Sequence, residues 1–477
     1  MARVLIAEAA KQVDQKVMVA GWVSVVRKHG KILFIDLRDK SGVLQCVLVP
    51  QNVKAYEAAQ EVRSEWVVEL TGQMIVRPEK MVNDQIETGK VELSVEELRV
   101  LAKAETLPFD VITDGREVGE EIRMKYRYLD LRRARLQKNL IVRHETIKFI
   151  RDFLSSRQFI EIETPIITKS TPEGARDFVV PSRLQAGKFY ALPQSPQQYK
   201  QLFMVAGLER YFQIARCFRD EDQRGDRQME FTQLDLEMSF VKQEDVMALV
   251  ENVMVDLVKK NFPNKKIQQI PFPHISYKEA MEKYGSDRPD MREDKNDPNL
   301  LAFCWVIDFP FFEKTEEGSW TFTHNPFSAP KAEHRDDLIA KKNIGGILTT
   351  QYDIALNGFE IGGGSMRNHH PEALQKVFEI MGYSSSEIKE KFGHMLEAFS
   401  FGAPPHGGIA WGLDRLISIL QNEPNIREVI AFPKTGDGRD LMMQAPSEIY
   451  DKQLKELHIN IMQNTKIKNK KRAKRTS

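Results

Sequence analysis

Residues 215–240 read ARCFRDEDQRGDRQMEFTQLDLEMSF. The pattern predicts two β-strands joined by a charged loop that contains Gly225. On the second strand, Leu234, Leu236 and Met238 share one face, because side chains alternate along a strand. The opposite face carries Phe231, Gln233, Asp235 and Glu237. A strand buried on one side and solvated on the other gives the same alternation, so parity alone does not decide whether these side chains form a site.

The loop of this hairpin is rich in arginine. Arg219, Arg224 and Arg227 predict a polyphosphate clamp, because guanidinium groups match phosphate oxygens with two parallel hydrogen bonds. Phe231 is placed to stack on a purine. The chain has no G-x-x-x-x-G-K-[ST] sequence and no G-x-G-x-x-G after a strand. We therefore expect a nucleotide to bind on an antiparallel sheet.

Two later segments fit the same site. In YDIALNGFEIGGGSMR, residues 352–367, Asp353 and Glu360 predict a Mg²⁺ site, since this ion takes one or two protein carboxylates together with phosphate oxygens. The three glycines that follow would admit a close ligand, although a glycine run is also typical of a turn. In GAPPHGGIAWGLDRLISIL, residues 402–420, a glycine-rich strand leads into a helix with Arg415 in its first turns.

The first hundred residues predict a separate barrel. Five alternating segments with a helical stretch after the third give the order of an OB-fold, whose outer face commonly binds single-stranded nucleic acid. A small barrel without a ligand fits the same pattern. On the segment KILFIDLRD, Phe34 faces outward among charged residues and predicts a base-stacking platform. Arg27, His29 and Gln45 are the candidates for hydrogen bonds to base edges.

Composition narrows the class of protein. With 477 residues, 42% hydrophobic and 29% charged, the chain is typical of a soluble multidomain protein. It has no apolar run long enough for a membrane span and no signal-peptide pattern, so we expect a cytoplasmic protein without membrane contact. Three distant cysteines exclude a C-x-x-C zinc site. The basic segment 466–477 is typical of a solvated end, or of an arm that binds phosphates.

Several ordered motifs resemble the class II aminoacyl-tRNA synthetases. The three signature motifs are represented by FIEIETP (159–165), by the hairpin at 215–240 and by GLDRL (412–416). The segments STPEGARDF, QSPQQYKQLFM, HNPFSAP and EIGGGSMR resemble the bacterial-type aspartyl branch of this family, over nearly the whole chain. FIEIETP also predicts a strand that is preceded by a long helix and ended by Pro165.

The resemblance implies specific roles. Arg219 and Arg415 would be catalytic and would bind the phosphates of ATP. Other ATP-binding residues would be Asp220, Glu221, Gln228, Phe231, Glu360, Gly412, Leu413 and Asp414. Those for L-aspartate would be Glu173, Ser195, Gln197, Lys200, Arg219, Asp235, His324 and Arg367, and those for Mg²⁺ would be Asp353 and Glu360. Lys200 and Arg367 would receive the substrate's side-chain carboxylate, whereas Glu173 and Asp235 would attract its ammonium group.

The resemblance also implies an α+β architecture. It consists of a five-stranded OB-fold barrel for the anticodon (1–104), a hinge (105–135), an antiparallel-sheet catalytic domain (136–450) and a C-terminal helix with the basic tail (451–477). We expect a homodimer. The domain-sized insertion usual between the second and third motifs is reduced to a few residues near 290–300, and we expect the chemistry to survive its loss.

The expected reaction is activation of L-aspartate by ATP, with transfer to tRNA(Asp). His29 resembles the residue of enzymes that also accept tRNA(Asn), although a polar loop residue before Gly30 fits the same position. The alternatives are an asparaginyl or lysyl synthetase, which would be less well served by the two cations Lys200 and Arg367, and a tRNA-independent amino-acid ligase, which would not need an anticodon barrel. A protein that only binds nucleic acid would have no use for Arg219, Asp353 and Glu360 together.

Overall fold

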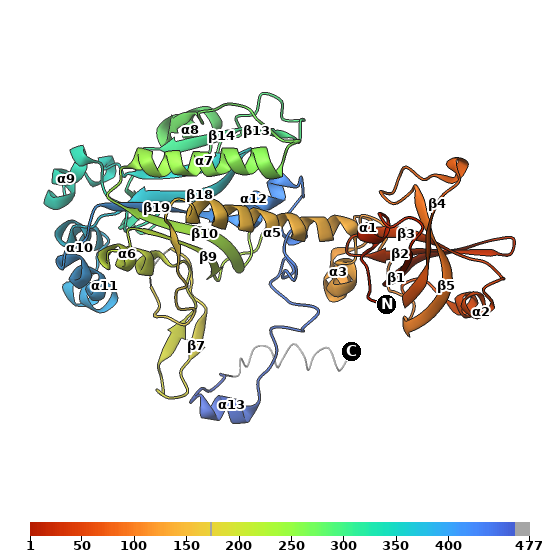
Figure 1. The fold of residues 1–477 in the computed structure, drawn as a ribbon. Coiled ribbons are helices and arrows are strands. Elements are labelled where there is room, and N and C mark those ends of the chain that lie inside the picture. Colours follow the sequence, from red (N-terminus) through yellow and green to blue (C-terminus); the bar gives the residue numbers. More distant parts are fainter. Residues whose placement is uncertain (172–173, 463–477) are drawn as a thin grey trace, which may run out of the picture. The chain divides into compact units, whose positions relative to one another are not determined.

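The computed structural model describes residues 1–171 and 174–462. The chain divides into two compact units, Met1–Gly115 and Arg116–Ser477 (Figure 1). Among the described residues, no helix is both long enough and apolar enough to cross a membrane. The predicted basic arm at 466–477 lies outside the described residues.

The first unit is a closed five-stranded barrel with the strand order β1-β2-β3-β5-β4. Its strands are β1 (Lys16–His29), β2 (Ile32–Asp39), β3 (Gly42–Leu48), β4 (Val67–Val76) and β5 (Val91–Ala102). Its helices are α1 (Ile6–Ala9), α2 (Val53–Glu61) and the 3₁₀ turn η1 (Glu79–Met81). Leu33, Ile35 and Leu37 are at most 5% exposed, whereas Phe34 lies on the outer face. The predicted OB barrel with a helix after the third strand is confirmed.

The second unit is built on an eight-stranded sheet with the order β12-β14-β17-β18-β19-β10-β9-β6. Its strands are β6 (Ile160–Glu161), β9 (Arg210–Phe218), β10 (Glu230–Ser239), β12 (His274–Ser276), β14 (Phe303–Ile307), β17 (Gln351–Leu356), β18 (Phe359–Met366) and β19 (His406–Gly412). The central strands from β14 to β9 are antiparallel. The predicted class of fold is therefore confirmed.

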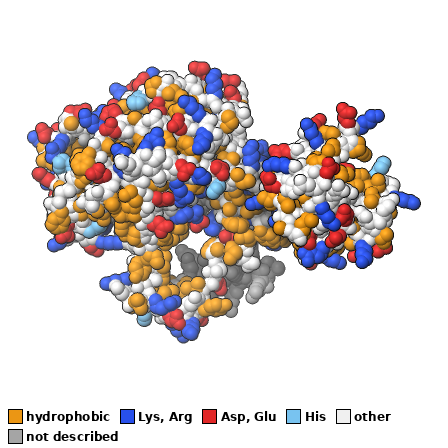
Figure 2. All heavy atoms as spheres, in the orientation of Figure 1, with side chains coloured by type: hydrophobic (Ala, Val, Ile, Leu, Met, Phe, Trp, Pro, Cys, Tyr) orange, Lys and Arg blue, Asp and Glu red, His pale blue; other side chains and the backbone are white. Residues whose placement is uncertain are grey.

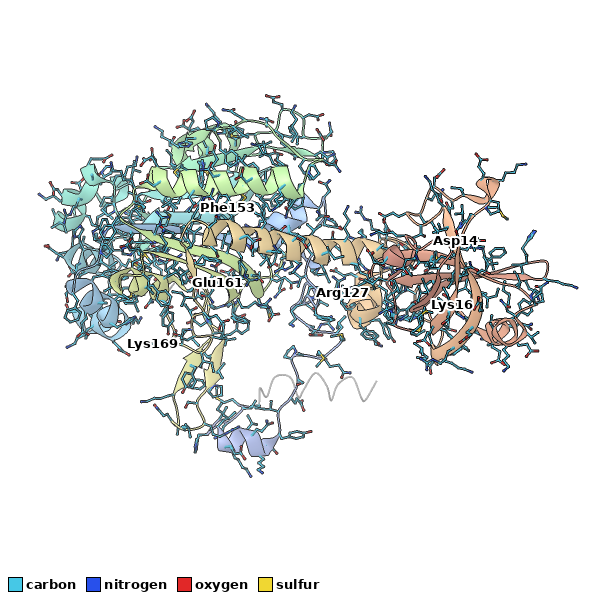
Figure 3. All side chains as sticks on the ribbon, viewed as in Figure 1. Asp14, Lys16, Arg127, Phe153, Glu161 and Lys169 are labelled. Atoms are coloured by element: carbon cyan, nitrogen blue, oxygen red, sulfur yellow. The ribbon has the colours of Figure 1, made fainter. Side chains whose placement is uncertain are left out.

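Long helices cover one face of this sheet (Figure 1). They are α5 (Ala134–Ser155), α7 (Gln243–Asn261) and α12 (Leu413–Leu420). Leu234, Leu236 and Met238 of β10 pack in one core with Phe153 of α5 and with α7. Phe153 is labelled in Figure 3, near Glu161 of β6. The predicted strand FIEIETP is shorter than expected, because only Ile160 and Glu161 pair with β9.

Smaller elements complete the second unit. The helices are α3 (Glu120–Lys125), α4 (Arg127–Asp130), α6 (Gln197–Val205), α8 (Tyr277–Tyr284), α9 (Arg335–Ala340), α10 (Pro371–Ile380), α11 (Ser385–Ser400) and α13 (Asp451–Glu456). The strand pairs are β7 (Val179–Pro181) with β8 (Phe189–Ala191), β11 (Lys266–Ile267) with β13 (Leu300–Leu301), and β15 (Phe312–Lys314) with β16 (Trp320–Phe322). The 3₁₀ turns are η2 (Ala332–His334), η3 (Ile344–Gly346) and η4 (Ile426–Glu428).

The segment that carries α3 and α4 is held by buried ion pairs. Asp130 is fully buried and accepts hydrogen bonds from Arg123, Arg127 and Arg133 at 2.7–3.1 Å. Arg123 also bonds Glu428 of η4 through two hydrogen bonds. Removing one partner from such a cluster leaves an unpaired buried charge, so these ion pairs fix residues 120–133 to the rest of the second unit.

Candidate active site

Two adjoining cavities lie on the face of the sheet opposite α5 and α7. The larger one has a volume of about 650 Å³ and the smaller one about 200 Å³. Both are lined by β10, β18 and β19 and by the hairpin loop between β9 and β10. Gln233 and Asp235 line the larger cavity, and Asp235 and Glu237 are fully buried. The polar face of β10 is therefore buried and borders a cavity, and the alternative of a solvated face is wrong.

A cluster of four buried charges lies beside the larger cavity. Lys200 of α6 bonds Asp235 at 2.6 Å and lies 3.5 Å from Glu237. Arg367, which follows β18, donates two hydrogen bonds to Glu237, at 2.8 and 3.0 Å. Each of the four side chains is at most 3% exposed. The two cations are thus held in place by two acids, and the cluster has no net charge.

The cluster shifts the pKa of its own members. Burial raises the pKa of Asp235, against the opposing effect of Lys200. Burial would also raise the pKa of Glu237, but Arg367 and Lys200 outweigh it and lower that pKa. The pKa of Arg367 is raised, because Glu237 outweighs the effect of burial. Glu237 is therefore the firmly ionised partner that keeps Arg367 charged.

Three residues that line the larger cavity each carry a buried polar atom with no hydrogen-bond partner among the described residues. These atoms are Nε2 of Gln197, Oδ2 of Asp235 and Nε2 of His324. Buried polar atoms are usually paired, so these three indicate the place of a polar ligand. Ser195 also lines the cavity, and its hydroxyl accepts from the backbone N–H of Gln197. The predicted residue Glu173 lies outside the described residues.

The predicted metal ligands lie on neighbouring strands. Asp353 of β17 pairs with Gly363 of β18, and Glu360 also borders the larger cavity. Burial and then the nearby Glu360 raise the pKa of Asp353 well above its ordinary value. A cation between these two carboxylates would relieve that repulsion, and oxygen donors suit Mg²⁺, so the pair fits the ion. No group of three or more His, Cys, Asp or Glu side chains with metal-site geometry occurs in residues 1–171 and 174–462.

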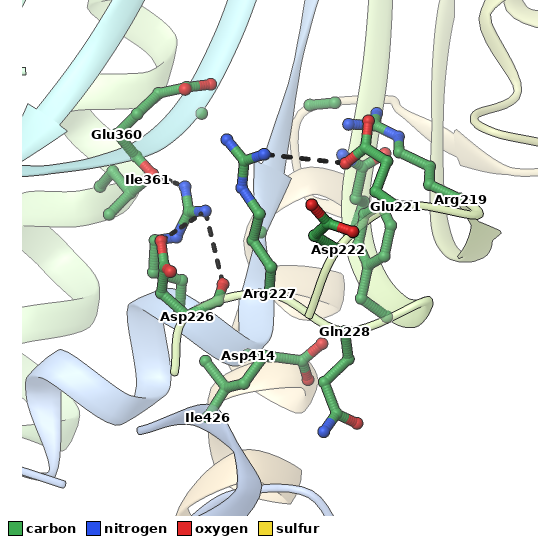
Figure 4. Close-up of a pocket in the computed structure, with 16 residues that line it drawn as sticks. Arg219, Glu221, Asp222, Asp226, Arg227, Gln228, Glu360, Ile361, Asp414 and Ile426 are labelled. Carbon is green, nitrogen blue, oxygen red and sulfur yellow. Dashed lines mark hydrogen bonds and ion pairs between the residues drawn. The ribbon is translucent and has the colours of Figure 1, made fainter. Parts of the chain in front are cut away.

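The smaller cavity gathers the residues predicted for the nucleotide (Figure 4). The Arg219 guanidinium lies over the Phe231 ring, 5.1 Å from its centroid. Arg415 bonds the backbone carbonyl of Glu360 and lies 3.2 Å from the carboxylate of Asp226. Arg227 and Glu221 form a looser ion pair of 3.8 Å across the cavity. An aromatic ring and three guanidinium groups in one recess match a purine and its phosphates.

Other predicted nucleotide residues support the cavity from behind. Gln228 lines it, but its amide is already bonded to both the N–H and the C=O of Lys434. Asp414 accepts from Arg143 of α5 and, at 2.9 Å, from the backbone N–H of Thr232, so it ties α12 to β10. Leu413 is fully buried in the core.

Gly412 and Asp220 were also predicted to bind the nucleotide. Gly412 borders the smaller cavity. Asp220 lines neither the larger nor the smaller cavity and lies beside Arg176 on an exposed recess. Any contact of Asp220 with a nucleotide would therefore need this recess to be occupied too.

On the barrel, three of the four predicted tRNA residues lie close together. Arg27 bonds both oxygens of Asp36, at 2.6 and 2.8 Å, and also the side-chain oxygen of Gln45 at 3.2 Å. Phe34 pairs with Arg27 across β1 and β2. His29 is exposed at the end of β1. The ring of Phe34 thus stands between polar groups on the outer face, as a base-stacking site requires.

Sequence reasoning missed the role of Glu237. Its position on the polar face of β10 was visible, but its partner Arg367 lies 130 residues away and meets it only in the folded sheet. The sequence feature that could have pointed to Glu237 is the glycine at position 408. Glu237 faces Gly408 across the sheet, and a Cβ at 408 would lie 2.2 Å from Oε2 of Glu237. Asp226, which orients Arg415, left no comparable signal.

Comparisons with known proteins agree with this site. Residues 119–436 match the family model of class II tRNA synthetases (D, K and N), and residues 17–101 match an OB-fold nucleic acid binding domain. The chain is 40% identical to the aspartate–tRNA(Asp/Asn) ligase of Rubrobacter xylanophilus over 576 aligned positions, covering 95% of both chains. The corresponding ligase of Dictyoglomus turgidum is 41% identical, over 95% of this chain and 97% of its own.

These alignments are longer than the chain itself. The excess is about a hundred positions, the size of a small domain. The relatives therefore carry about a domain's worth of sequence that this chain lacks, and a reduced insertion near 290–300 stays a prediction.

Solved structures share the fold. The asparaginyl-tRNA synthetase of Pyrococcus horikoshii complexed with asparaginyl-adenylate has a TM-score of 0.73 at 22% identity, over 91% of this chain and 98% of that one. The aspartyl-tRNA synthetase of Entamoeba histolytica has a TM-score of 0.71 at 22% identity, over 91% of both chains. The extent of the family match and the 40% identity over nearly the full length establish that the chain belongs to the class II tRNA synthetases, among the relatives of the aspartate–tRNA(Asp/Asn) ligases.

Proposed function

We propose that the protein activates L-aspartate with ATP and transfers it to tRNA(Asp) and to tRNA(Asn). The observation that carries this proposal is the buried pair of cations, Lys200 and Arg367, at the larger cavity. A substrate carboxylate can accept hydrogen bonds from both. Oδ2 of Asp235, which has no hydrogen-bond partner among the described residues, would accept from the substrate ammonium group.

This cluster favours aspartate over asparagine and lysine. An asparagine side chain has no charge, and its amide N–H groups would face two groups that only donate, which leaves buried donors unpaired. A lysine side chain would bring a third cation to the cavity. The solved asparaginyl synthetases share only the fold at this level of identity, so the two donors Lys200 and Arg367 are the better guide to the amino acid.

Catalysis rests on placement of the two substrates. The α-carboxylate of aspartate is ionised at neutral pH and needs no base before it attacks the α-phosphorus of ATP. Arg219, which borders both cavities, is placed to neutralise negative charge at the reacting phosphate. Phe231 would hold the adenine ring, and Arg415 would bind the far phosphates. Pyrophosphate leaves, and aspartyl-adenylate remains for attack by the 3′-terminal ribose of the tRNA.

Asp353 and Glu360 would hold Mg²⁺. When bound, the ion supplies positive charge that offsets the charge of the phosphates. In this chain the two residues lie on adjacent strands and both line the larger cavity. Glu360 also lines the smaller cavity, so the triphosphate would meet the amino acid beside it.

Exposed hydrophobic side chains on the second unit indicate where two copies of the chain would form a dimer. Hydrophobic side chains are exposed on α5 and on the segment after it, at Ile141, Ile160 and Ile167, with exposures of 48–55%. The β7–β8 hairpin also exposes large hydrophobic side chains, which Figure 2 shows. Exposed apolar patches of this kind mark interfaces, so we infer that a second copy covers them.

The choice of tRNA rests on the barrel. The two anticodons differ at the third position only, so one or two side chains near His29 and Phe34 can decide whether both are accepted. The imidazole of His29 is exposed and would contact a base of either anticodon.

The first test is charging of purified tRNA(Asp) and tRNA(Asn) transcripts with labelled aspartate, ATP, Mg²⁺ and the pure protein. Aspartate attached to both transcripts is the expected result. Aspartate on tRNA(Asp) alone would contradict the dual acceptor and the role of His29. Charging with asparagine or lysine instead would contradict the amino acid. Aspartate-dependent pyrophosphate exchange without any charging would support a tRNA-independent ligase.

A further inference from the structure

A continuous chain of hydrogen bonds connects the cationic end of the larger cavity with the predicted metal ligands. It begins at Arg367, whose Nη1 donates to the hydroxyl of Ser365 at 2.7 Å. The hydroxyls of Ser365 and Ser328 lie 2.9 Å apart, and Ser328 is 3.3 Å from Oε1 of Gln351. Nε2 of Gln351 donates to Oδ1 of Asp353 at 2.6 Å. These five residues span three separate segments of the chain.

Every member of this chain is buried. Ser365 and Ser328 are at most 1% exposed, and Gln351 is 6% exposed. The two serines do not line either cavity, so a substrate would not touch them. The strand register brings them together, because Ser365 lies opposite Gln351 and Ser328 forms a bridge with Arg367.

Ser328 lies at the centre of this network. A guanidinium group only donates, so the Ser365 oxygen accepts from Arg367, and it also accepts from the hydroxyl of Ser328. The hydroxyl of Ser328 has a single proton, which is therefore shared between Ser365 and Oε1 of Gln351. The amide of Gln351 must turn its NH₂ toward the carboxylate of Asp353, since two oxygens facing each other would repel. The network thus joins a cation to a carboxylate through one shared proton, and polarisation of the hydrogen bonds at one end affects those at the other.

We propose that Ser365, Ser328 and Gln351 form a relay that couples aspartate at Arg367 to the orientation of Asp353, so that aspartate and magnesium-ATP bind cooperatively. This inference rests on the proposed function of the site. Gln351 fixes Oδ1 of Asp353, which leaves Oδ2, 3.7 Å from Nε2 of His324, directed to the cavity. A carboxylate that docks on Arg367 fixes the guanidinium at the other end. Binding of either ligand therefore orders the same network of hydrogen bonds, which reduces the cost of ordering it when the second ligand binds.

Ser328 is the residue that tests the relay, because its hydroxyl joins the two halves and contacts neither substrate. The experiment is calorimetric titration of aspartate into the full-length protein, first alone and then with saturating Mg²⁺ and a non-hydrolysable ATP analogue. The ratio of the two Kd values measures the coupling. For the wild-type protein we expect a ratio of at least about fivefold, the lower end of typical couplings between sites.

In Ser328→Ala the ratio is expected to fall to within about twofold of one, whereas Kd for aspartate alone changes less than about threefold, since Lys200 and Arg367 remain. Ser365→Ala breaks the same relay and should lose the same coupling. The double variant should lose no more, because both residues serve one chain. Ser239→Ala is the matched control: Ser239 is a buried serine of β10 that contacts the sulfur of Met204 and lines neither cavity.

Three results would overturn the relay. They are a wild-type protein without coupling, a folded Ser328→Ala variant that keeps the wild-type ratio, and an equal loss in Ser239→Ala. If Ser328→Ala does not fold, Ser365→Ala carries the same test. A wild-type protein that binds no aspartate under either condition would overturn the proposed function instead.

Discussion

Replacement of Lys200 by methionine tests the amino-acid site most directly. Methionine keeps the length of the side chain and removes the ammonium group that lies 2.6 Å from Asp235 and 3.5 Å from Glu237. Asp235 would then be a buried carboxylate without its cation, and its Oδ2 already has no partner among the described residues. The substrate carboxylate would also lose one of its two donors.

The structure sets the size of the effect. Truncating one partner of a buried, hydrogen-bonded charge pair between two binding partners costs about 2–5 kcal/mol, which corresponds to a loss of affinity of about 30-fold to several thousandfold. Protonation of Asp235 relieves part of this cost, because burial already raises its pKa. We therefore expect kcat/KM for aspartate to fall by about 10²–10³-fold, whereas KM for ATP changes less than about threefold.

Pyrophosphate exchange over a range of aspartate and ATP concentrations measures both quantities without tRNA. Lys265→Met is the matched control, since Lys265 is half-buried, bonds Pro298 and Asn422, and lines neither cavity. The double variant Lys200→Met with Asp235→Asn should regain thermal stability but not activity. A folded Lys200→Met protein with less than a tenfold loss in kcat/KM would refute the assignment of Lys200 to the substrate carboxylate.

The remaining predictions concern acid stability, metal and tRNA. His406 is fully buried, and burial lowers its pKa from 6.5 to about 4, so the folded state binds its proton less well than the unfolded state does. Stability is therefore complete above pH 6.5 and falls by about 3 kcal/mol as the pH drops to about 4. In His406→Gln this part of the loss should vanish, as seen in the thermal midpoint at stepped pH, and an unchanged pH dependence would contradict it. Asp353→Asn should raise the Mg²⁺ concentration for half-maximal pyrophosphate exchange by at least about tenfold, and an unchanged requirement would exclude Asp353 as a ligand. Phe34→Leu should raise KM for tRNA about tenfold and leave aspartate-dependent pyrophosphate exchange unchanged, since stacking on a base is worth about 1–3 kcal/mol; a tRNA KM equal to that of the wild type would remove the stacking role. Deletion of 466–477 should raise KM for tRNA and reduce its dependence on salt, and no change in either would sink the idea of a phosphate-binding arm.

Local pattern was sufficient to predict much of this fold. Alternation placed Leu33, Ile35 and Leu37 inside the barrel, and Leu234 and Leu236 in the core of the second unit. These predictions succeed because the side-chain direction in a strand depends only on its own register. The length of β6 was not predictable, since a strand ends where its neighbour β9 stops pairing with it.

The partners of the site residues could not be predicted from spacing. Asp235 was expected to face the substrate ammonium group, whereas in the structure one of its oxygens is bonded to Lys200. Asp414 was expected at the nucleotide; it lines the smaller cavity, and its carboxylate also bonds the backbone N–H of Thr232 in β10, which the sequence did not predict. Both contacts join segments that are far apart in sequence, and no local periodicity encodes which side chain another element will supply.

The glycines of β18 bear on how such an enzyme could acquire a different amino-acid specificity. A Cβ at Gly362 would lie 2.5 Å from Trp411, at Gly363 2.8 Å from Asp353, and at Gly364 2.3 Å from the backbone of Gly408. Not even alanine fits at any of the three without displacing a neighbour. Single substitutions at Gly362, Gly363 and Gly364 would therefore strain the sheet, both in natural evolution and in directed evolution. A change of specificity must begin in the walls, at side chains such as Lys200, where a new group can be introduced without moving the sheet.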